Sequence, residues 1–387
     1  YMAVESRGGV WTGEDEIAYL SDKSGVSQIW KISLSDRTPR QLTFYKERIW
    51  RLAAAANGKD LLFATDLGGN EQEQIYLLKD GAGEAVDLTR DGSSRFYLGG
   101  TNAASDTVYF SCNQRDKASF DICKLKIGTD QIETVLENHD NYNTPASVSP
   151  DGKYMLYNKL KGMSDNRMYI IDMETGESHD LYPEGSFAQY GDTAWKPDSS
   201  GFFGTTDEDS EFEYVAYYDV AAGKLTDVYH AEWDVSAVAL SRDGKYLAMV
   251  VNADGYGEFR IMDLDTGNLI SAPRPPKGFI YTYAGMDWSP SGHKLLFSFS
   301  SGSRPVGLWV LDLDADSVYA VTDSHIDGIS KDELVEPKLC EFHSFDGLRV
   351  PYWLYQAPGT AGKPGPVVLE IHGGPEGQEF PMYSPLI

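Results

Sequence analysis

The chain is poor in cysteine and has no long apolar run. Its 387 residues include only Cys112, Cys123 and Cys340, an odd and sparse set that does not make a disulfide framework. Cys112 and Cys123 could pair across two strands, but buried free thiols are the favoured interpretation. No segment approaches the roughly 18 apolar residues that a membrane span needs, and no signal-type apolar segment opens the chain. These absences favour a cytoplasmic protein.

Positive charge is also scarce. Lys and Arg total 33 against 59 Asp and Glu, which gives a net charge of −26 and a pI near 4.5. This balance argues against a nucleic-acid partner, because phosphates need Lys and Arg to replace their counterions. It argues against an anionic membrane surface for the same reason. The plain interpretation is an acidic protein in solution.

What the sequence has instead is an internal repeat. The stretch "SPDGKYMLY" at 149–157 has clear relatives in "SRDGKYLAMV" from Ser241, "SPSGHKLLF" from Ser289 and "KPDSSGFFG" from Lys196. With weaker copies included, its turn residue recurs at steps of 43 to 48 residues, at Glu14, Asn57, Ala104, Asp151, Asp198, Asp243 and Ser291. Seven units at this even spacing indicate a repeat architecture.

Each unit is built from strands. A Pro-Asp-Gly-type turn precedes an alternating apolar strand, and a polar stretch, an aromatic-rich strand and a short last strand follow. Three strands are clear, with room for a fourth before the turn. Aromatic residues make up 12% of the chain, which suits strands, and capped helix-period stretches are essentially missing. We therefore predict an all-β, seven-bladed β-propeller over residues 1–330, since a solenoid of this period would need helices.

The alternating Asp312, Asp314 and Asp316 look at first like a calcium loop. An EF-hand needs Gly at its sixth position and Glu at its twelfth, where this chain has Ser317 and Asp323. The repeat explains the stretch better, as the outer strand and turn of the seventh blade. The seven histidines lack HExxH-type spacing. We therefore predict no metal and no cofactor.

The repeat stops after Thr322, and a second domain of a different class is expected at 331–387. A polar linker leads to a hairpin, with strands at 338–344 and 348–356 joined by a Phe-Asp-Gly turn. A Pro/Gly loop follows. The apolar run from Pro366 to Ile371 is typical of a strand that is buried on both faces of an α/β sheet. A tight glycine turn, "HGGP" at 372–375, leaves this predicted strand.

These closing motifs carry a family resemblance. With its seven propeller units, the "LVEP" at 334–337, the "SFDG" at 344–347 and the "HGGP", the chain resembles the prolyl oligopeptidase family of serine peptidases. It is most similar to the acylaminoacyl-peptidase and dipeptidyl-peptidase branch. The resemblance covers essentially the whole chain and is most specific near its C-terminus, because TolB-type propellers use similar repeat units. It implies a seven-bladed β-propeller followed by the first strands of an α/β-hydrolase domain.

The resemblance also implies a Ser-Asp-His triad, gated by a propeller that admits only peptides or acylated amino acids. In an α/β-hydrolase the nucleophile lies in Gly-x-Ser-x-Gly, and this motif does not occur here. All three triad residues are therefore expected beyond Ile387, so the chain is expected to be truncated and inactive alone. The implied oxyanion hole uses a backbone N–H of Gly373 or Gly374, with His372 where some relatives carry a tyrosine. The alternative is a turn with no catalytic role.

Substrate contacts and the class of protein stay open at this point. Dipeptidyl peptidases hold a substrate amine with propeller carboxylates, but turn structure and solvation explain the candidates here equally well, so none is assigned: Asp116, Glu208, Glu211, Asp254 and Glu258. The alternative to a gated peptidase is a non-enzymatic, TolB-like propeller that binds a protein or peptide. A propeller enzyme that works through its central channel has no supporting pattern. A homo-oligomer is compatible with either function.

Overall fold

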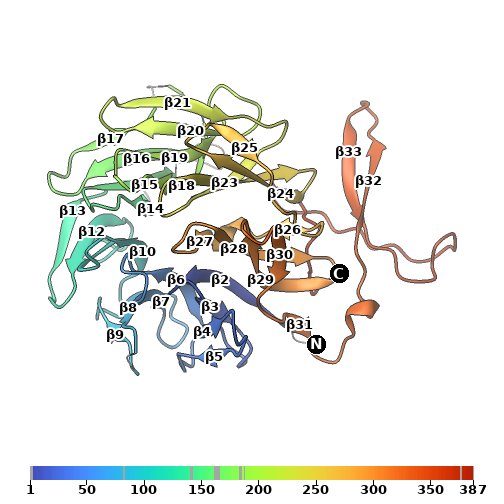
Figure 1. The fold of residues 1–387 in the computed structure, drawn as a ribbon, viewed down its shortest axis with the longest axis horizontal. Helices are drawn as coiled ribbons and strands as arrows, with labels where there is room; N and C mark the ends of the chain where they lie inside the picture. Colours follow the sequence, from blue (N-terminus) through green and yellow to red (C-terminus); the bar gives the residue numbers. More distant parts are fainter. Residues whose placement is uncertain are drawn as a thin grey trace.

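The computed structural model describes residues 3–81, 83–139, 143–160, 166–182, 185–186, 188–374 and 377–386. Seven antiparallel sheets follow one another in chain order around a common axis (Figure 1). The seven-bladed β-propeller predicted from the repeat is therefore confirmed. The two helices within the described ranges are single 3-10 turns, η1 (Thr282–Ala284) and η2 (Lys331–Glu333). No helix in this part of the chain is long and apolar enough to cross a membrane.

The first four blades each contain four strands. Blade 1 contains β2 (Ser6–Trp11), β3 (Glu16–Ser21), β4 (Gln28–Ser33) and β5 (Arg40–Gln41). Blade 2 contains β6 (Ile49–Ala54), β7 (Leu61–Thr65), β8 (Gln74–Leu78) and β9 (Val86–Asp87). Blade 3 contains β10 (Phe96–Thr101), β11 (Thr107–Cys112), β12 (Asp121–Lys126) and β13 (Ile132–Leu136). Blade 4 contains β14 (Asn143–Val148), β15 (Tyr154–Leu160), β16 (Asn166–Asp172) and β17 (Ser178–Asp180).

The last three blades repeat this order. Blade 5 contains β18 (Tyr190–Trp195), β19 (Gly201–Thr206), β20 (Tyr214–Asp219) and β21 (Lys224–Tyr229). Blade 6 contains β22 (Val235–Leu240), β23 (Tyr246–Ala253), β24 (Tyr256–Asp263) and β25 (Asn268–Ile270). In blade 7 the inner strand is split by η1 into β26 (Phe279–Ile280) and β27 (Met286–Trp288), and the rest is β28 (Lys294–Ser301), β29 (Arg304–Asp312) and β30 (Ser317–Ala320).

The repeated turn joins the first and second strands of a blade, so the room for a fourth strand is filled by the inner strand. In blade 4 the Ser149 hydroxyl accepts the N–H of Tyr154 at 2.8 Å, and the Asp151 carboxylate accepts the N–H of Lys153 at 3.0 Å. Gly152 has φ +73°, a conformation in which glycine carries no steric cost. We call the face of the ring that carries these turns the turn face. The opposite face, where second strands lead into third strands, is the C-terminal face.

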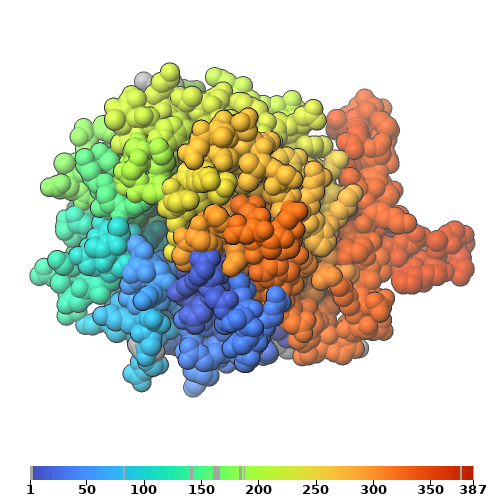
Figure 2. Space-filling model, viewed as in Figure 1, coloured from blue at the N-terminus to red at the C-terminus, as the bar shows by residue number. Residues whose placement is uncertain are grey.

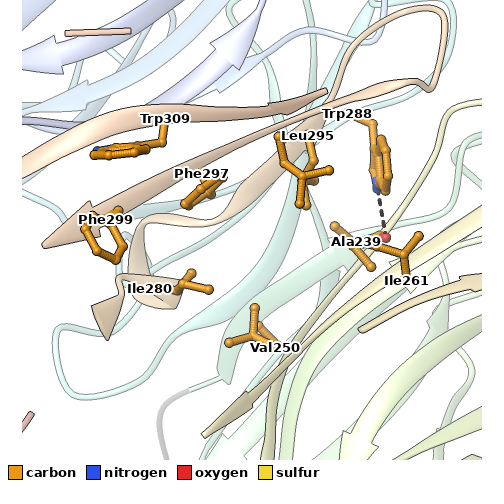
Figure 3. Close-up of a cluster of buried hydrophobic side chains, with 12 residues drawn as sticks. Ala239, Val250, Ile261, Ile280, Trp288, Leu295, Phe297, Phe299 and Trp309 are labelled. Atoms are coloured by element: carbon orange, nitrogen blue, oxygen red, sulfur yellow. Dashed lines mark hydrogen bonds between the residues drawn. The ribbon is translucent and has the colours of Figure 1, made fainter. Parts of the chain in front are cut away.

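Tryptophans at one position of the repeat tie neighbouring blades together. The indole N–H of Trp288 in blade 7 donates to the Ala239 carbonyl of blade 6 at 3.0 Å, over a core that includes Leu295 and Phe297 (Figure 3). Trp195 in blade 5 donates in the same way to Ser147 Oγ of blade 4 at 3.1 Å. Each ring fills the space between two sheets while its polar atom is satisfied, which makes the contact both apolar and directional.

The ring closes without a shared strand, because each blade is built from consecutive strands. Trp11 in blade 1 donates its backbone N–H to Asp287 Oδ2 of blade 7 at 2.8 Å and its indole N–H to the Asp287 carbonyl at 3.1 Å. At the turn face, Ser291 donates its N–H and its hydroxyl to Glu14, at 3.0 and 2.7 Å. The two ends of the propeller also pair directly, as β1 (Ala3–Val4) with β31 (His325–Ile326).

Two local interpretations are confirmed inside the blades. Cys112 and Cys123 are free, buried thiols in blade 3, with their sulfur atoms 3.6 Å apart. The acidic stretch that resembled a calcium loop is the end of β29 and its turn into β30, where the Asp312 carboxylate accepts the N–H of Ala315 at 3.0 Å. This turn bond is the local reason for an acid at that position.

After the propeller, the chain forms a separate lobe at the edge of the ring (Figure 2). The predicted hairpin is confirmed as β32 (Lys338–His343) and β33 (Arg349–Leu354), joined by the Phe-Asp-Gly turn. The buried strand predicted at 366–371 is wrong for this structure, since the segment is irregular and the Val367 and Val368 side chains are 88% and 93% exposed. A strand needs a neighbour to pair its backbone groups, and the described residues supply none there.

Candidate functional site

A cavity of about 320 Å³ opens on the C-terminal face, where blades 5, 6 and 7 meet the end of the chain. Its lining combines acids, small polar groups and aromatic rings: Gln189, Gly191, Glu213, Asp234, Ser236, Val250, Asn252, Gly257, Phe279, Ile280, Thr282, Tyr283 and Phe380. A concave site with convergent polar groups and aromatic walls is the usual form of a small-molecule or peptide site.

Two carboxylates stand side by side in this cavity. Glu213 is the residue before β20 in blade 5, and Asp234 is the residue before β22 in blade 6. The Glu213 carbonyl accepts the N–H of Val235 at 2.8 Å, and Asp234 Oδ1 accepts the N–H of Glu213 at 3.0 Å. These backbone bonds fix both residues at the seam between the blades. Among the described residues, neither carboxylate forms an ion pair.

The repeat supplies an internal comparison at the seam between blades 2 and 3. Glu73 precedes β8 as Glu213 precedes β20, and the Glu73 carbonyl accepts the N–H of Phe96 at 3.0 Å in the same way. The residue that corresponds to Asp234 is Arg95, whose guanidinium lies 2.8 Å from Glu73 Oε1. One seam therefore carries an ion pair, whereas the other carries two acids at equivalent positions and an open cavity.

This arrangement changes the acidity of Glu213. Burial, and then the negative charges of Asp234 and Asp207, raise the pKa of the Glu213 carboxyl to about 7. A carboxylate in this setting gains from any cation that enters the cavity, because the cation replaces the missing water and offsets the repulsion. The blade 5–6 seam thus has a second acid where the blade 2–3 seam has a guanidinium, and no cationic side chain pairs with either acid among the described residues.

The end of the chain forms the other wall of the cavity. The Phe380 ring packs against Phe279 with ring centroids 4.2 Å apart. Beside it, Asn252 Nδ2 donates to Gln378 Oε1 at 2.8 Å. The segment 377–386 therefore rests on blades 6 and 7 and leaves the carboxylates facing an aromatic surface.

The predicted oxyanion residues lie outside this cavity. Residues 372–374 are exposed and irregular, and the polar contact recorded within the stretch joins His372 Nδ1 to the Gly373 carbonyl at 2.8 Å. An added Cβ at Gly373 would meet nothing within 4 Å, so no close approach there requires glycine. Pro375 lies outside the described residues. The oxyanion role of Gly373, Gly374 and His372 stays a prediction.

The loop acids considered from the sequence do not line the cavity. Asp116 caps its own turn by accepting the N–H of Ala118 at 3.0 Å, and Glu258 pairs with Arg260 at 2.8 Å. Sequence reasoning missed Glu213 and Asp234. An alignment of the seven units at the residues just before the first and third strands would have shown that Asp234 of blade 6 stands where blade 3 has Arg95.

A closed seven-bladed ring with an acidic cavity beneath the end of the chain defines a propeller domain that carries a cavity on one face. The family model for the N-terminal β-propeller domain of prolyl oligopeptidase matches residues 43–324. The chain therefore belongs to the prolyl oligopeptidase family, and a non-enzymatic TolB-like propeller is not favoured. No curated protein matches the chain.

Solved structures agree on the fold. Puromycin hydrolase is 16% identical with a TM-score of 0.78, and the match covers 98% of this chain and 63% of that chain. A puromycin-hydrolyzing peptidase of Mycobacterium tuberculosis is 14% identical with a TM-score of 0.77, covering 98% and 62%. A prolyl endopeptidase structure is 16% identical with a TM-score of 0.73, covering 92% and 55%. The chain thus spans between about half and two thirds of the length of these proteins.

Proposed function

We propose that these residues form the substrate-gating propeller of a serine peptidase in the acylaminoacyl-peptidase and dipeptidyl-peptidase branch. The family match over residues 43–324 carries the proposal. The hairpin that follows the propeller, with its "LVEP" and "SFDG" motifs, supports the assignment to this branch. The catalytic serine, aspartate and histidine would lie outside these 387 residues, because the Gly-x-Ser-x-Gly motif is missing from them. A cytoplasmic location and homo-oligomerisation remain part of the proposal.

In the complete enzyme, residues 367–371 would become a strand of the α/β-hydrolase sheet. Gly373 or Gly374 would then direct a backbone N–H at the substrate carbonyl, beside His372. Such a donor stabilises the oxyanion that forms when the nucleophile attacks. The exposed apolar side chains at 367–371 support this proposal, since an apolar strand of this kind gains by pairing and burial in a sheet.

The substrate that we propose is a peptide with a cationic group. Glu213 and Asp234 would hold an ammonium or guanidinium group at the seam between blades 5 and 6, where Arg95 stands at the equivalent seam. An acylated amino acid is the second candidate, and it would reach the same cavity without this charge contact.

Active-site labelling tests the peptidase assignment. A fluorophosphonate probe reacts with an activated serine, so it should label a longer form that contains a Gly-x-Ser-x-Gly segment and leave these 387 residues unlabelled. Labelling of the 387-residue chain itself would contradict the assignment of the nucleophile.

Kinetics on the longer form test the substrate. Paired substrates that differ only in a free or acetylated amine should respond differently to Glu213→Gln. We expect the kcat/KM of the free-amine substrate to fall about 10- to 100-fold, the value of a lost hydrogen bond to a charged group. The acetylated substrate should be unaffected. Equal losses for both substrates would contradict a cation site, and Glu174→Gln, at an exposed turn of blade 4, is the matched control.

A further inference from the structure

One position of the repeated turn stands out when the seven blades are compared. The residue just before the turn acid is small or a proline in six blades: Gly13, Ala56, Ala103, Pro150, Pro197 and Pro290. In blade 6 the same position is Arg242. A long charged side chain at this point of a tight turn needs a reason other than the turn itself, because six smaller residues make the same turn.

The Arg242 side chain crosses the axis of the ring on the turn face. One terminal nitrogen lies 3.5 Å from the Trp11 carbonyl of blade 1 and 3.6 Å from Asp287 Oδ2 of blade 7. The other lies 3.1 Å from the point where a Cβ on Gly58 of blade 2 would stand. Blade 2 is three blades away from blade 6 in a ring of seven. An Arg242 guanidinium that reaches the turn of blade 2 therefore extends over the centre of the ring.

Seven blades arranged around an axis enclose a central channel, which their inner strands line. Asp192, on the inner strand of blade 5, is exposed, yet protein surrounds it closely enough for desolvation to raise the pKa of its carboxyl to about 6. A carboxylate that is accessible yet closely surrounded by protein is expected of a narrow channel. In blades 1 to 6 the register between the first and second strands shifts within the inner strand, an irregularity of the kind that a β-bulge produces and that bends the strand locally.

We propose that Arg242 closes the turn-face mouth of the central channel, so that the channel opens only on the C-terminal face beside the cavity. Its two polar contacts are long, at 3.5 and 3.6 Å, so the guanidinium covers the mouth without a tight bond to either partner. Access from the turn face then depends on the length of one side chain. This proposal does not require the chain to be part of a peptidase.

Cross-linking from one side of the ring tests the closure. Ala56→Cys places a thiol outside the mouth, on the exposed turn of blade 2, and Asp192→Cys places one inside the channel. Cys340→Ser removes the accessible native thiol, while Cys112 and Cys123 are buried. A bis-maleimide that spans about 20 Å, the length of six strand residues, can join the two cysteines only through the mouth. Intact mass reports the cross-linked fraction.

We expect little cross-linking while Arg242 is present and a several-fold increase with Arg242→Ala. Arg242→Pro, the residue found at three equivalent turns, should give the same increase, and it serves as the second variant if the alanine variant folds poorly. Arg260→Ala removes another arginine of blade 6, away from the axis, and should behave like the parent. Equal cross-linking with and without Arg242 in folded variants would overturn the proposal.

Discussion

The carboxyl of Glu213 makes the stability of the propeller depend on pH in a way that can be calculated. Its pKa is about 7 in the folded chain, against an ordinary value of 4.5. Because the folded state holds the proton more tightly than the unfolded state, the contribution of Glu213 is most favourable below pH 4.5 and declines as the pH rises through 7. The difference in pKa corresponds to about 3 kcal/mol at high pH, an upper limit because the Glu213 side chain is only partly buried.

The substitution Glu213→Gln replaces the titrating carboxyl by a neutral amide of similar size. The free energy of unfolding of the variant minus that of the parent should therefore rise by up to about 2–3 kcal/mol from pH 5 to pH 8. Urea unfolding of both proteins at the two pH values measures the change. Taking the difference between proteins cancels the titration of the other acids, and Glu174→Gln controls for the loss of one surface charge.

A free energy of unfolding that responds to pH in the same way in parent and Glu213→Gln would refute this reasoning. In that case the two acids at the seam would already be compensated, and the comparison with the Glu73–Arg95 pair would lose its force. A variant that is less stable than the parent by the same amount at both pH values would also refute it. Such a result would indicate the loss of a contact of Glu213 rather than the removal of an unfavourable buried charge.

Two further predictions concern the seams between blades. Asp234→Arg should recreate the Glu73–Arg95 pair, so the pH dependence assigned to Glu213 should disappear in the same urea assay; an unchanged dependence would mean that the guanidinium does not reach the carboxylate. Trp288→Phe leaves the Ala239 carbonyl without its donor and should cost about 1–3 kcal/mol in free energy of unfolding, whereas equal stability would show that water replaces the indole.

The blade architecture could be predicted from the sequence because a turn leaves strong local marks. Ser149, Asp151 and Gly152 are each required by a hydrogen bond or a positive φ within six residues, so the motif repeats wherever the turn does. The hairpin after the propeller was predictable for the same reason. Local chemistry of this kind does not depend on distant parts of the chain.

The cavity could not be located in this way, because its residues come from three blades and the end of the chain. Glu213 and Asp234 are 21 positions apart, and each resembles any other loop acid until the blades are assembled. The strand predicted at 366–371 failed for a related reason. A run of apolar residues marks a segment that can form a buried strand. Forming the strand also needs a neighbouring strand to pair with, and the described residues do not contain one there.

The way the ring closes has a consequence for the order of the chain. Within the described residues, no blade contains strands from both ends of the propeller, so a circular permutant cut between any two blades would leave every strand pair of the blades intact. The old ends lie together, with Ala3 paired to Ile326, so a short linker would join them. The permutant would turn the blade 7–1 seam into a covalent connection and open another seam in its place. The order of the blades around the ring is therefore cyclic, and the chain could begin at any of the seven seams between blades.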